Sequence, residues 1–129
     1  MRAKILNASA GSGKTYQLAY KYVHDVIEEP ELYRHILAVT FTNKATEEMK
    51  SRILKEIHHL AAGEESNYLR NLCDELSLDE RTVRKRAASA QAKILHDYSR
   101  FTVLTIDTFF QRILRAFIKE LGIDLNYNV

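Results

Sequence analysis

The sequence has few of the residues that mark secreted, membrane-bound or strongly basic proteins. Its single cysteine, Cys73, excludes an internal disulfide and indicates a reducing compartment. One proline and four glycines are too few for long loops or a Pro-rich linker. Lys and Arg total 19 against 17 for Asp and Glu, and the net charge of +2 excludes a bulk polycation. Any contact with nucleic acid therefore has to be local.

Long apolar runs are also absent. No run reaches the roughly 18 residues that suggest a membrane span, and the apolar stretch near Met1 is too short for a signal peptide. What is present is a chain of 129 residues, 46% hydrophobic and 28% charged, which is typical of one globular domain. We therefore expect a soluble cytoplasmic domain with no membrane partner.

The apolar pattern predicts three strand–helix units. The expected strands are 5–6, 35–41 and 101–106. The expected helices run from Lys14 to Pro30, from a cap at Thr42 or Asn43 to Gly63, and from a cap at Asp107 or Thr108 to Gly122. The second strand is almost continuously apolar, which is typical of a strand covered on both faces. This alternation predicts an α/β fold with a parallel sheet flanked by helices.

Residues 64–99 interrupt the alternation with two further helices, which we interpret as a helical insertion. Ser77-Leu78-Asp79-Glu80 has the form of a capping box that begins the second of them. That helix carries a basic run, which is either a solvated face or a contact for phosphates. The run consists of Arg81, Arg84, Lys85 and Arg86.

The most specific pattern is Ala8-Ser9-Ala10-Gly11-Ser12-Gly13-Lys14-Thr15, between an expected strand and an expected helix. Gly11 and Gly13 allow the backbone to fold closely around a polyphosphate, and helix N-terminal amides favour anions. Lys14 would reach the β- and γ-phosphates as the catalytic cation, and Thr15 would hold Mg²⁺. The pattern predicts a P-loop, although Ala8 stands where the general pattern has glycine. The predicted binding residues are Ala10, Gly11, Ser12, Gly13, Lys14 and Thr15.

A second segment, Thr40-Phe41-Thr42-Asn43-Lys44-Ala45, lies where a strand is expected to end and a helix to begin. Ligands of open α/β sheets bind beyond such strand ends. Thr, Asn and free helix amides suit phosphodiester oxygens, and Phe41 could stack on a base. The alternative is that Thr42 and Asn43 only cap the helix and that Phe41 belongs to the core.

Three segments together resemble the start of UvrD/Rep-type superfamily 1 DNA helicases, most closely the RecB/AddA exonuclease V branch. These segments are 8–15, 36–49 and 105–115. Alanine at position 8 is common in that family. The resemblance implies that residues 1–129 are the N-terminal part of a RecA-like ATP-binding domain, called domain 1A. It also implies ATP-driven translocation, 3′ to 5′, along single-stranded DNA in repair or recombination.

The resemblance also implies roles for individual residues. Lys14 and Thr15 would serve ATP and Mg²⁺. The residues expected to contact DNA are Phe41, Thr42, Asn43, Thr105, Asp107 and Phe109. Asp107 stands where the family commonly has histidine, and a carboxylate there would repel a phosphate. We therefore expect Asp107 to cap the helix or to contact a base or the protein.

Phosphoryl transfer also needs an acid on Mg²⁺, a residue that positions water and a cation for the transition state. The one candidate acid is Asp107, which is followed by Thr108 rather than glutamate. The resemblance implies that the acidic and arginine motifs follow position 129. We therefore expect weak nucleotide binding and little or no hydrolysis by this chain alone. The expected partners are the remaining helicase domains of a longer chain, with nuclease or partner subunits as further candidates.

Two other functions remain open from the sequence. A self-contained small P-loop kinase or NTPase, with Asp107 as its metal or substrate acid, would turn over by itself. An interaction module with a vestigial loop would be insensitive to Lys14→Ala. A zinc site is not expected, because His58 and His59 have no partner set at metal-ligand spacing.

Overall fold

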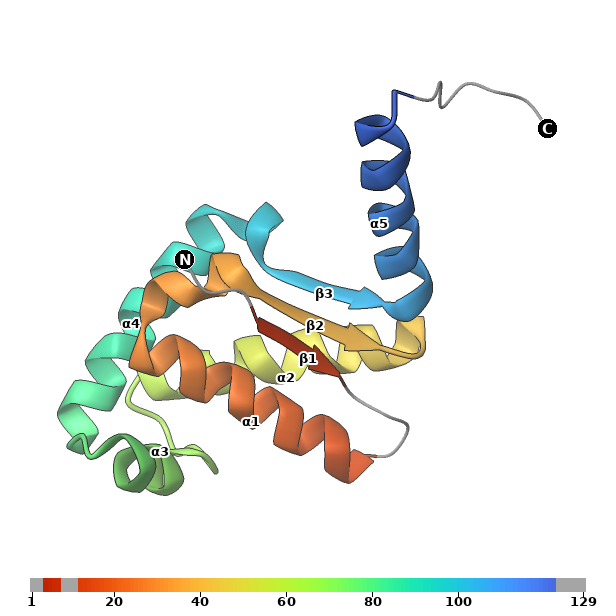
Figure 1. Cartoon of the computed structure of the whole chain (residues 1–129). Helices are drawn as coiled ribbons and strands as arrows, with labels where there is room; N and C mark the ends of the chain where they lie inside the picture. The colour runs from red at the N-terminus through yellow and green to blue at the C-terminus, as the bar shows by residue number, and fades with distance from the viewer. Residues whose placement is uncertain (1–3, 8–11, 123–129) are drawn as a thin grey trace.

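The computed structural model describes residues 4–7 and 12–122, with side chains over 16–122. Strands β1 (Lys4–Asn7), β2 (Ile36–Thr40) and β3 (Thr102–Thr105) form a parallel sheet in the order β1-β2-β3 (Figure 1). The register pairs Asn7 with Val39 and Thr40 with Thr105. The predicted parallel α/β sheet is therefore confirmed, and its strands end along one edge.

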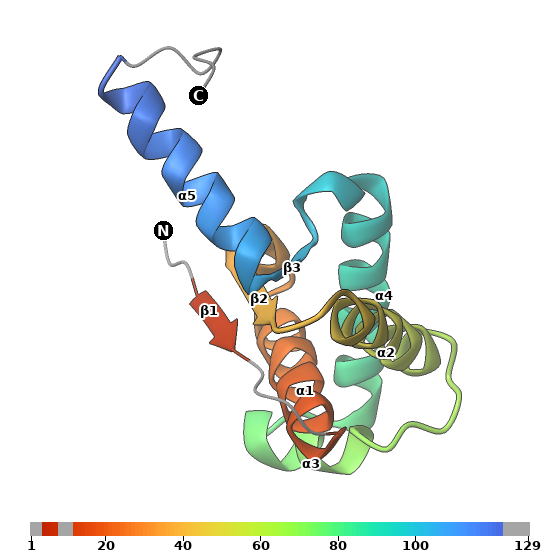
Figure 2. The same ribbon diagram turned by 90° about the vertical axis from the view of Figure 1, so that its right-hand side faces the viewer.

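Five helices accompany the sheet in the described part of the chain. They are α1 (Ser12–Glu28), α2 (Asn43–Ala61), α3 (Leu69–Leu76), α4 (Glu80–His96) and α5 (Ile106–Glu120). Short 3₁₀ helices, η1 (Pro30–His35) and η2 (Tyr98–Arg100), precede β2 and β3. Figures 1 and 2 show α1, α2 and α4 gathered on one side of the sheet, whereas α5 projects away from the end of β3. No helix of the described residues has the length and apolarity to cross a membrane.

The helix starts agree only in part with the predicted caps. Thr42 caps α2, because its side chain accepts a hydrogen bond from the Ala45 amide. The predicted capping box is wrong: Asp79 caps α4, while Ser77 ends α3 in the left-handed region at φ 55°. The predicted cap at Asp107 or Thr108 is also wrong, because Thr105 caps α5 and the helix begins at Ile106.

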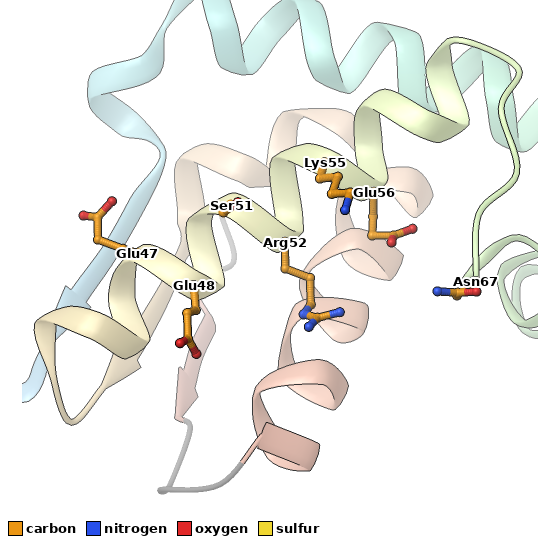
Figure 3. Close-up of a pocket in the computed structure, with 7 residues that line it drawn as sticks. All are labelled: Glu47, Glu48, Ser51, Arg52, Lys55, Glu56 and Asn67. Atoms are coloured by element: carbon orange, nitrogen blue, oxygen red, sulfur yellow. The ribbon is translucent and has the colours of Figure 1, made fainter.

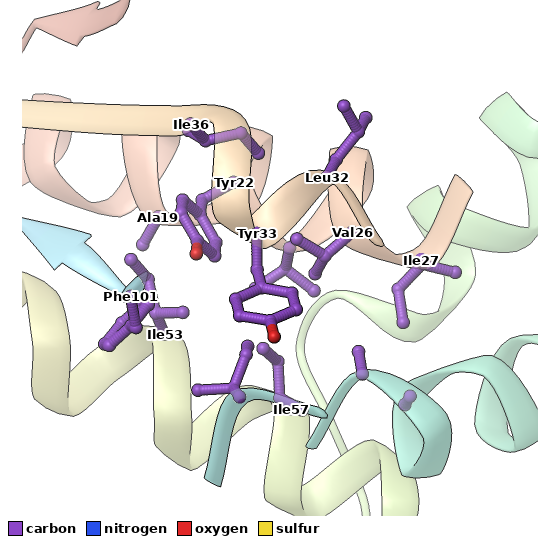
Figure 4. Close-up of a cluster of buried hydrophobic side chains, with 14 of the residues drawn as sticks. Ala19, Tyr22, Val26, Ile27, Leu32, Tyr33, Ile36, Ile53, Ile57 and Phe101 are labelled. Atoms are coloured by element: carbon purple, nitrogen blue, oxygen red, sulfur yellow. The ribbon is translucent and has the colours of Figure 1, made fainter. Parts of the chain in front are cut away.

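The hydrophobic core lies between the sheet and α1, η1, α2 and α4 (Figure 4). Tyr22, Tyr33, Ile53 and Ile57 are among its largest buried side chains. The prediction that the second strand is covered on both faces is only partly met. Ile36 and Ala38 join this core, whereas Leu37 and Val39 on the opposite face do not belong to it. Val39 is nevertheless buried, while Leu37 is half-buried. The helical layer therefore covers one face of the described sheet, and the opposite face of β2 is covered in part.

Helix α4 holds the C-terminal ends of α1 and α2 through two arginines of the basic run. The Arg84 guanidinium donates to the carbonyls of His59, Leu60 and Glu64 at 3.3, 3.1 and 2.9 Å. Arg86 donates to the carbonyls of Ile27 and Glu28 at 3.3 and 2.9 Å. The last carbonyls of a helix lack intrahelical partners and carry partial negative charge, so a cation there is stabilising.

The two interpretations of the basic run are a solvated face and a contact for phosphates. For two of its four members, Arg84 and Arg86, these bonds support neither interpretation. Arg84 and Arg86 bind the protein's own backbone, and neither points freely to solvent. Lys85 is exposed on the same helix. Helix α4 therefore acts as a structural clamp on the C-terminal ends of α1 and α2.

We predict that Arg84→Ala lowers the free energy of unfolding by about 2 kcal/mol, because hydrogen bonds from a charged group contribute roughly that much. Chemical denaturation of the variant measures the change. Lys85→Ala is the matched control, since it removes a cation one residue along the same helix. Equal stability of the two variants would contradict the clamp.

Candidate nucleotide and nucleic-acid site

The predicted functional segments meet at the edge where the strands end. β2 leads into residues 41–43, here called the 41–43 turn, and β3 leads into residues 105–109, here called the 105–109 segment. Because Thr40 pairs with Thr105 and adjacent strands lie about 4.8 Å apart, these two segments are neighbours. β1, the strand that precedes α1 in the chain, lies on the other side of β2 (Figure 1).

The predicted phosphate-binding residues begin α1. Ala10 and Gly11 lie outside the described residues, whereas residues 12–15 form the first turn of the helix. The first amides of a helix have no intrahelical acceptor and favour anions. No acidic residue stands in this turn to oppose a phosphate. The backbone placement therefore suits a polyphosphate.

The 41–43 turn is exposed rather than buried. The Phe41 side chain lies beyond the end of β2 and is 55% exposed, so the alternative that it belongs to the core is wrong. Thr42 Oγ1 accepts from the Ala45 amide at 3.0 Å. A hydroxyl that accepts in this way still has its own proton to donate. Thr42 can therefore cap α2 and bind a phosphate oxygen at the same time, while Asn43 lies exposed beside it.

The 105–109 segment is arranged around a second cap. Thr105 Oγ1 accepts from the Thr108 amide at 3.2 Å and donates to Thr108 Oγ1 at 3.0 Å. Its proton is thus committed, and the proton of Thr108 remains available. Sequence reasoning missed Thr108 as a donor because only the cap geometry distinguishes the two hydroxyls.

Asp107 and Phe109 differ in their exposure within that segment. Asp107 is exposed in the first turn of α5, where a carboxylate is favoured by the helix dipole without capping the helix. Phe109 is half-buried and Phe110 is 62% exposed, with ring centroids 6.2 Å apart. Phe110 therefore lies outside the core.

A depression of about 510 Å³ lies along α2 (Figure 3). Its lining residues are Glu47, Glu48, Ser51, Arg52, Lys55, Glu56 and Asn67. Arg52 lies over the ring of Tyr16, 5.4 Å from its centroid, and Tyr16 packs edge-on against Tyr68 at 5.2 Å. Tyr16 is thus engaged in packing between α1 and α2. The mixed charges of this depression do not favour an anion over a cation.

Helix α1 carries His24, Asp25 and Glu28, whose ligand atoms lie within 4.8 Å of one another, with Asp25 buried and Glu28 exposed. His24 Nδ1 lies 3.1 Å from Asp25 Oδ1, and its Nε2 lies 4.0 Å from Glu75 Oε2 on α3. Tyr20 also donates to Glu75 at 2.6 Å. Burial, together with this bond, raises the pKa of Tyr20 well above its usual range. We interpret these side chains as the polar contact between α1 and α3.

Comparison with known proteins identifies the family. The chain matches the UvrD/REP helicase N-terminal domain over residues 2–129. It belongs to this family. The resemblance drawn from the three sequence segments is therefore confirmed.

Several members of the UvrD/REP family are similar over much of the chain. The exonuclease/helicase subunit RexA of Lactococcus lactis subsp. cremoris (strain MG1363) is 30% identical over 97% of this chain and 9% of its own length. The RecBCD enzyme subunit RecB of Escherichia coli (strain K12) is 31% identical over 92% of this chain and 11% of its own. The ATP-dependent DNA helicase PcrA of Staphylococcus epidermidis (strain RP62A, ATCC 35984) is 42% identical over 50% of this chain and 8% of its own.

The chain thus spans 8% to 11% of the length of these three UvrD/REP relatives. No solved structure matches it.

We predict that Thr42→Ala lowers the free energy of unfolding by about 1 kcal/mol, because the N-cap acceptor of α2 is lost. Thr42→Ser keeps the acceptor and should retain stability to within a few tenths of a kcal/mol. Thermal or urea unfolding of the two variants checks this. An alanine variant as stable as the serine variant would contradict the assigned cap.

Proposed function

We propose that this chain is the ATP-binding portion of an ATP-dependent 3′–5′ DNA helicase that acts on single-stranded DNA in repair or recombination. The observation that carries the proposal is the meeting of three strand ends at one edge of the sheet. The start of α1, the 41–43 turn and the 105–109 segment all follow those ends. Membership in the UvrD/REP family supports the assignment.

ATP and Mg²⁺ are the cofactors that fit the start of α1. The chemistry of residues 12–15 suits them, because backbone amides, a lysine and a threonine are the groups that bind nucleotide phosphates and their metal. In this proposal Lys14 binds the β- and γ-phosphates and Thr15 holds Mg²⁺. When ATP is bound, phosphoryl transfer from it would supply the free energy for movement along DNA. The residues of this chain would orient the phosphates.

Single-stranded DNA would lie along the strand ends of β2 and β3. Phe41 offers an exposed ring for stacking on a base. Thr42 and Asn43 offer hydrogen-bond donors for the phosphates of the DNA backbone. The 105–109 segment continues the same edge of the sheet with Thr105, Asp107 and Phe109. Within that segment the Thr105 hydroxyl already donates to Thr108, which favours Thr108 over Thr105 as the phosphate donor. The exposed carboxylate of Asp107 suits a base amino group better than a phosphate.

The residues after β3 do not favour a self-contained kinase or NTPase. A metal-binding acid commonly follows an apolar strand as Asp-Glu, whereas Asp107, the acid that follows β3, is succeeded by Thr108. Asp107 lies exposed in the first turn of α5. We infer that the chain alone binds nucleotide without appreciable hydrolysis.

In this proposal residues 1–129 are the N-terminal part of a RecA-like 1A domain, with residues 64–99 as its helical insertion. The remaining helicase domains of a longer chain would be its main partners. The lengths of the relatives support this, and so does α5, none of whose residues is buried. Relatives named exonuclease/helicase subunit RexA and RecBCD enzyme subunit RecB make nuclease or partner subunits further candidates.

We predict that Phe41→Ala weakens binding of a fluorescent oligothymidylate to this chain about tenfold, because one base-stacking contact is lost. Fluorescence anisotropy measures the dissociation constant. Phe110→Ala is the matched control, since Phe110 is similarly exposed on α5 but lies outside the proposed contacts. Equal affinities of both variants and the parent chain would overturn the DNA assignment.

We predict that Lys14→Ala abolishes measurable binding of a fluorescent ATP analogue in the presence of Mg²⁺, because the cation on the phosphates is lost. Lys21→Ala, a lysine two turns along the same helix, should leave binding unchanged. Fluorescence titration provides the constants, and a phosphate-release assay should show no turnover. Rapid turnover by the parent chain would favour the small NTPase instead.

A further inference from the structure

A pair of buried hydroxyl groups lies directly beneath the 41–43 turn. Thr40, the last residue of β2, is fully buried, and Thr46, in the first turn of α2, is 8% exposed. Their Oγ1 atoms are 2.6 Å apart. Buried hydroxyls need hydrogen-bond partners, because an unpaired polar group away from water is destabilising.

The carbonyl partners of this pair lie on two segments, the 41–43 turn and β3. Thr40 Oγ1 is 3.2 Å from the Thr42 carbonyl oxygen and 3.4 Å from that of Leu104 on β3. Thr46 Oγ1 is 3.1 Å from the same Thr42 carbonyl. Each hydroxyl has one proton to donate. The two protons are therefore shared among the Thr42 carbonyl, the Leu104 carbonyl and the two hydroxyl oxygens themselves.

The other bonds of the 41–43 turn run to α2, where the Thr46 amide donates to the Thr42 carbonyl at 3.0 Å. Phe41 is 55% exposed, so burial of its ring does not anchor it. The cap from Thr42 to the Ala45 amide orients the start of α2 but does not reach β3. Among the side-chain bonds of the described residues, the one from Thr40 to the Leu104 carbonyl joins the end of β2 to the end of β3.

We propose that the Thr40–Thr46 hydroxyl pair is a positioning element that fixes the 41–43 turn and aligns it with the 105–109 segment. Both hydroxyls are buried and act through the turn rather than by touching DNA themselves. The consequence for DNA affinity rests on the proposed function, whereas the consequence for the order of the turn does not. A valine at either position would have nearly the same side-chain shape as threonine but would lose the hydrogen bonds of the hydroxyl.

The absence of tryptophan from the chain allows a direct test. Phe41→Trp places a single indole on the turn, and Thr40→Val and Thr40→Ser are then introduced in that background. Time-resolved anisotropy of the indole without DNA reports the local motion of the turn. Titration with oligothymidylate, read by quenching of the same indole, reports affinity.

We expect Thr40→Val to make the indole more mobile and to weaken oligonucleotide binding about fivefold, the effect of one lost hydrogen bond. Thr40→Ser retains the hydroxyl and should restore both values, which a role in packing alone would not produce. The control is the same threonine series with the reporter at Phe110→Trp on α5, whose motion should not change. If Thr40→Val does not fold, Thr46→Val removes the other hydroxyl and gives the same comparison.

The outcomes separate this inference from the proposed function. Unchanged indole motion and affinity in a folded Thr40→Val chain would overturn the positioning role, even if Phe41→Ala still weakens DNA binding. Increased motion restored by serine, without any quenching by DNA, would support the positioning role and contradict the DNA assignment. Equal losses in the valine and serine variants would show a packing role and overturn the inference.

Discussion

Parallel pairing of the three strands is the constraint on which the arrangement of this chain depends. Because each strand of a parallel sheet runs in the same direction, whatever follows one strand lies beside whatever follows its neighbour. Pairing of Thr40 with Thr105 therefore brings together two segments that are 64 residues apart in the chain. The start of α1 joins the same edge through the pairing of Asn7 with Val39. In the proposed function, one edge of the sheet binds both the nucleotide and the DNA strand.

The helical layer keeps that edge in place from the opposite end of the molecule. α1 and α2 begin at the strand ends and finish far from them, where α4 crosses their last turns (Figure 1). Arg84 and Arg86 bind the carbonyls exposed there, and Lys93 pairs with Glu31 at 2.6 Å. Helices α1 and α2 are therefore fixed at their C-termini by α4. Within the basic run, Arg84 and Arg86 thus have a structural role.

The sequence predicted the order of strands and helices, the insertion and the position of the 41–43 turn. Those features depend on periodicity and on local turn chemistry, which a single sequence carries. The cap of α5 was misplaced because Thr105, Asp107 and Thr108 are all competent caps, and only the end of β3 decides among them. Ser77 likewise resembles a cap residue but adopts the left-handed region that ends α3. The sequence could not show that Arg84 and Arg86 bind carbonyls, since those partners lie on other helices.

The apolar side of α5 follows from the same sheet geometry. Phe110, Leu114 and Phe117 recur at helical spacing, yet each is more than half exposed. The helix leaves the end of β3 and projects away from the side of the sheet on which α1, α2 and α4 pack (Figure 2). An exposed apolar stripe of this kind is unfavourable in water and is typical of a surface that other structure covers. Burial of that stripe by further structure would also fix the direction in which the 105–109 segment faces. The order of the edge proposed to contact DNA would then depend on two supports, the Thr40–Thr46 pair beneath the 41–43 turn and whatever covers α5.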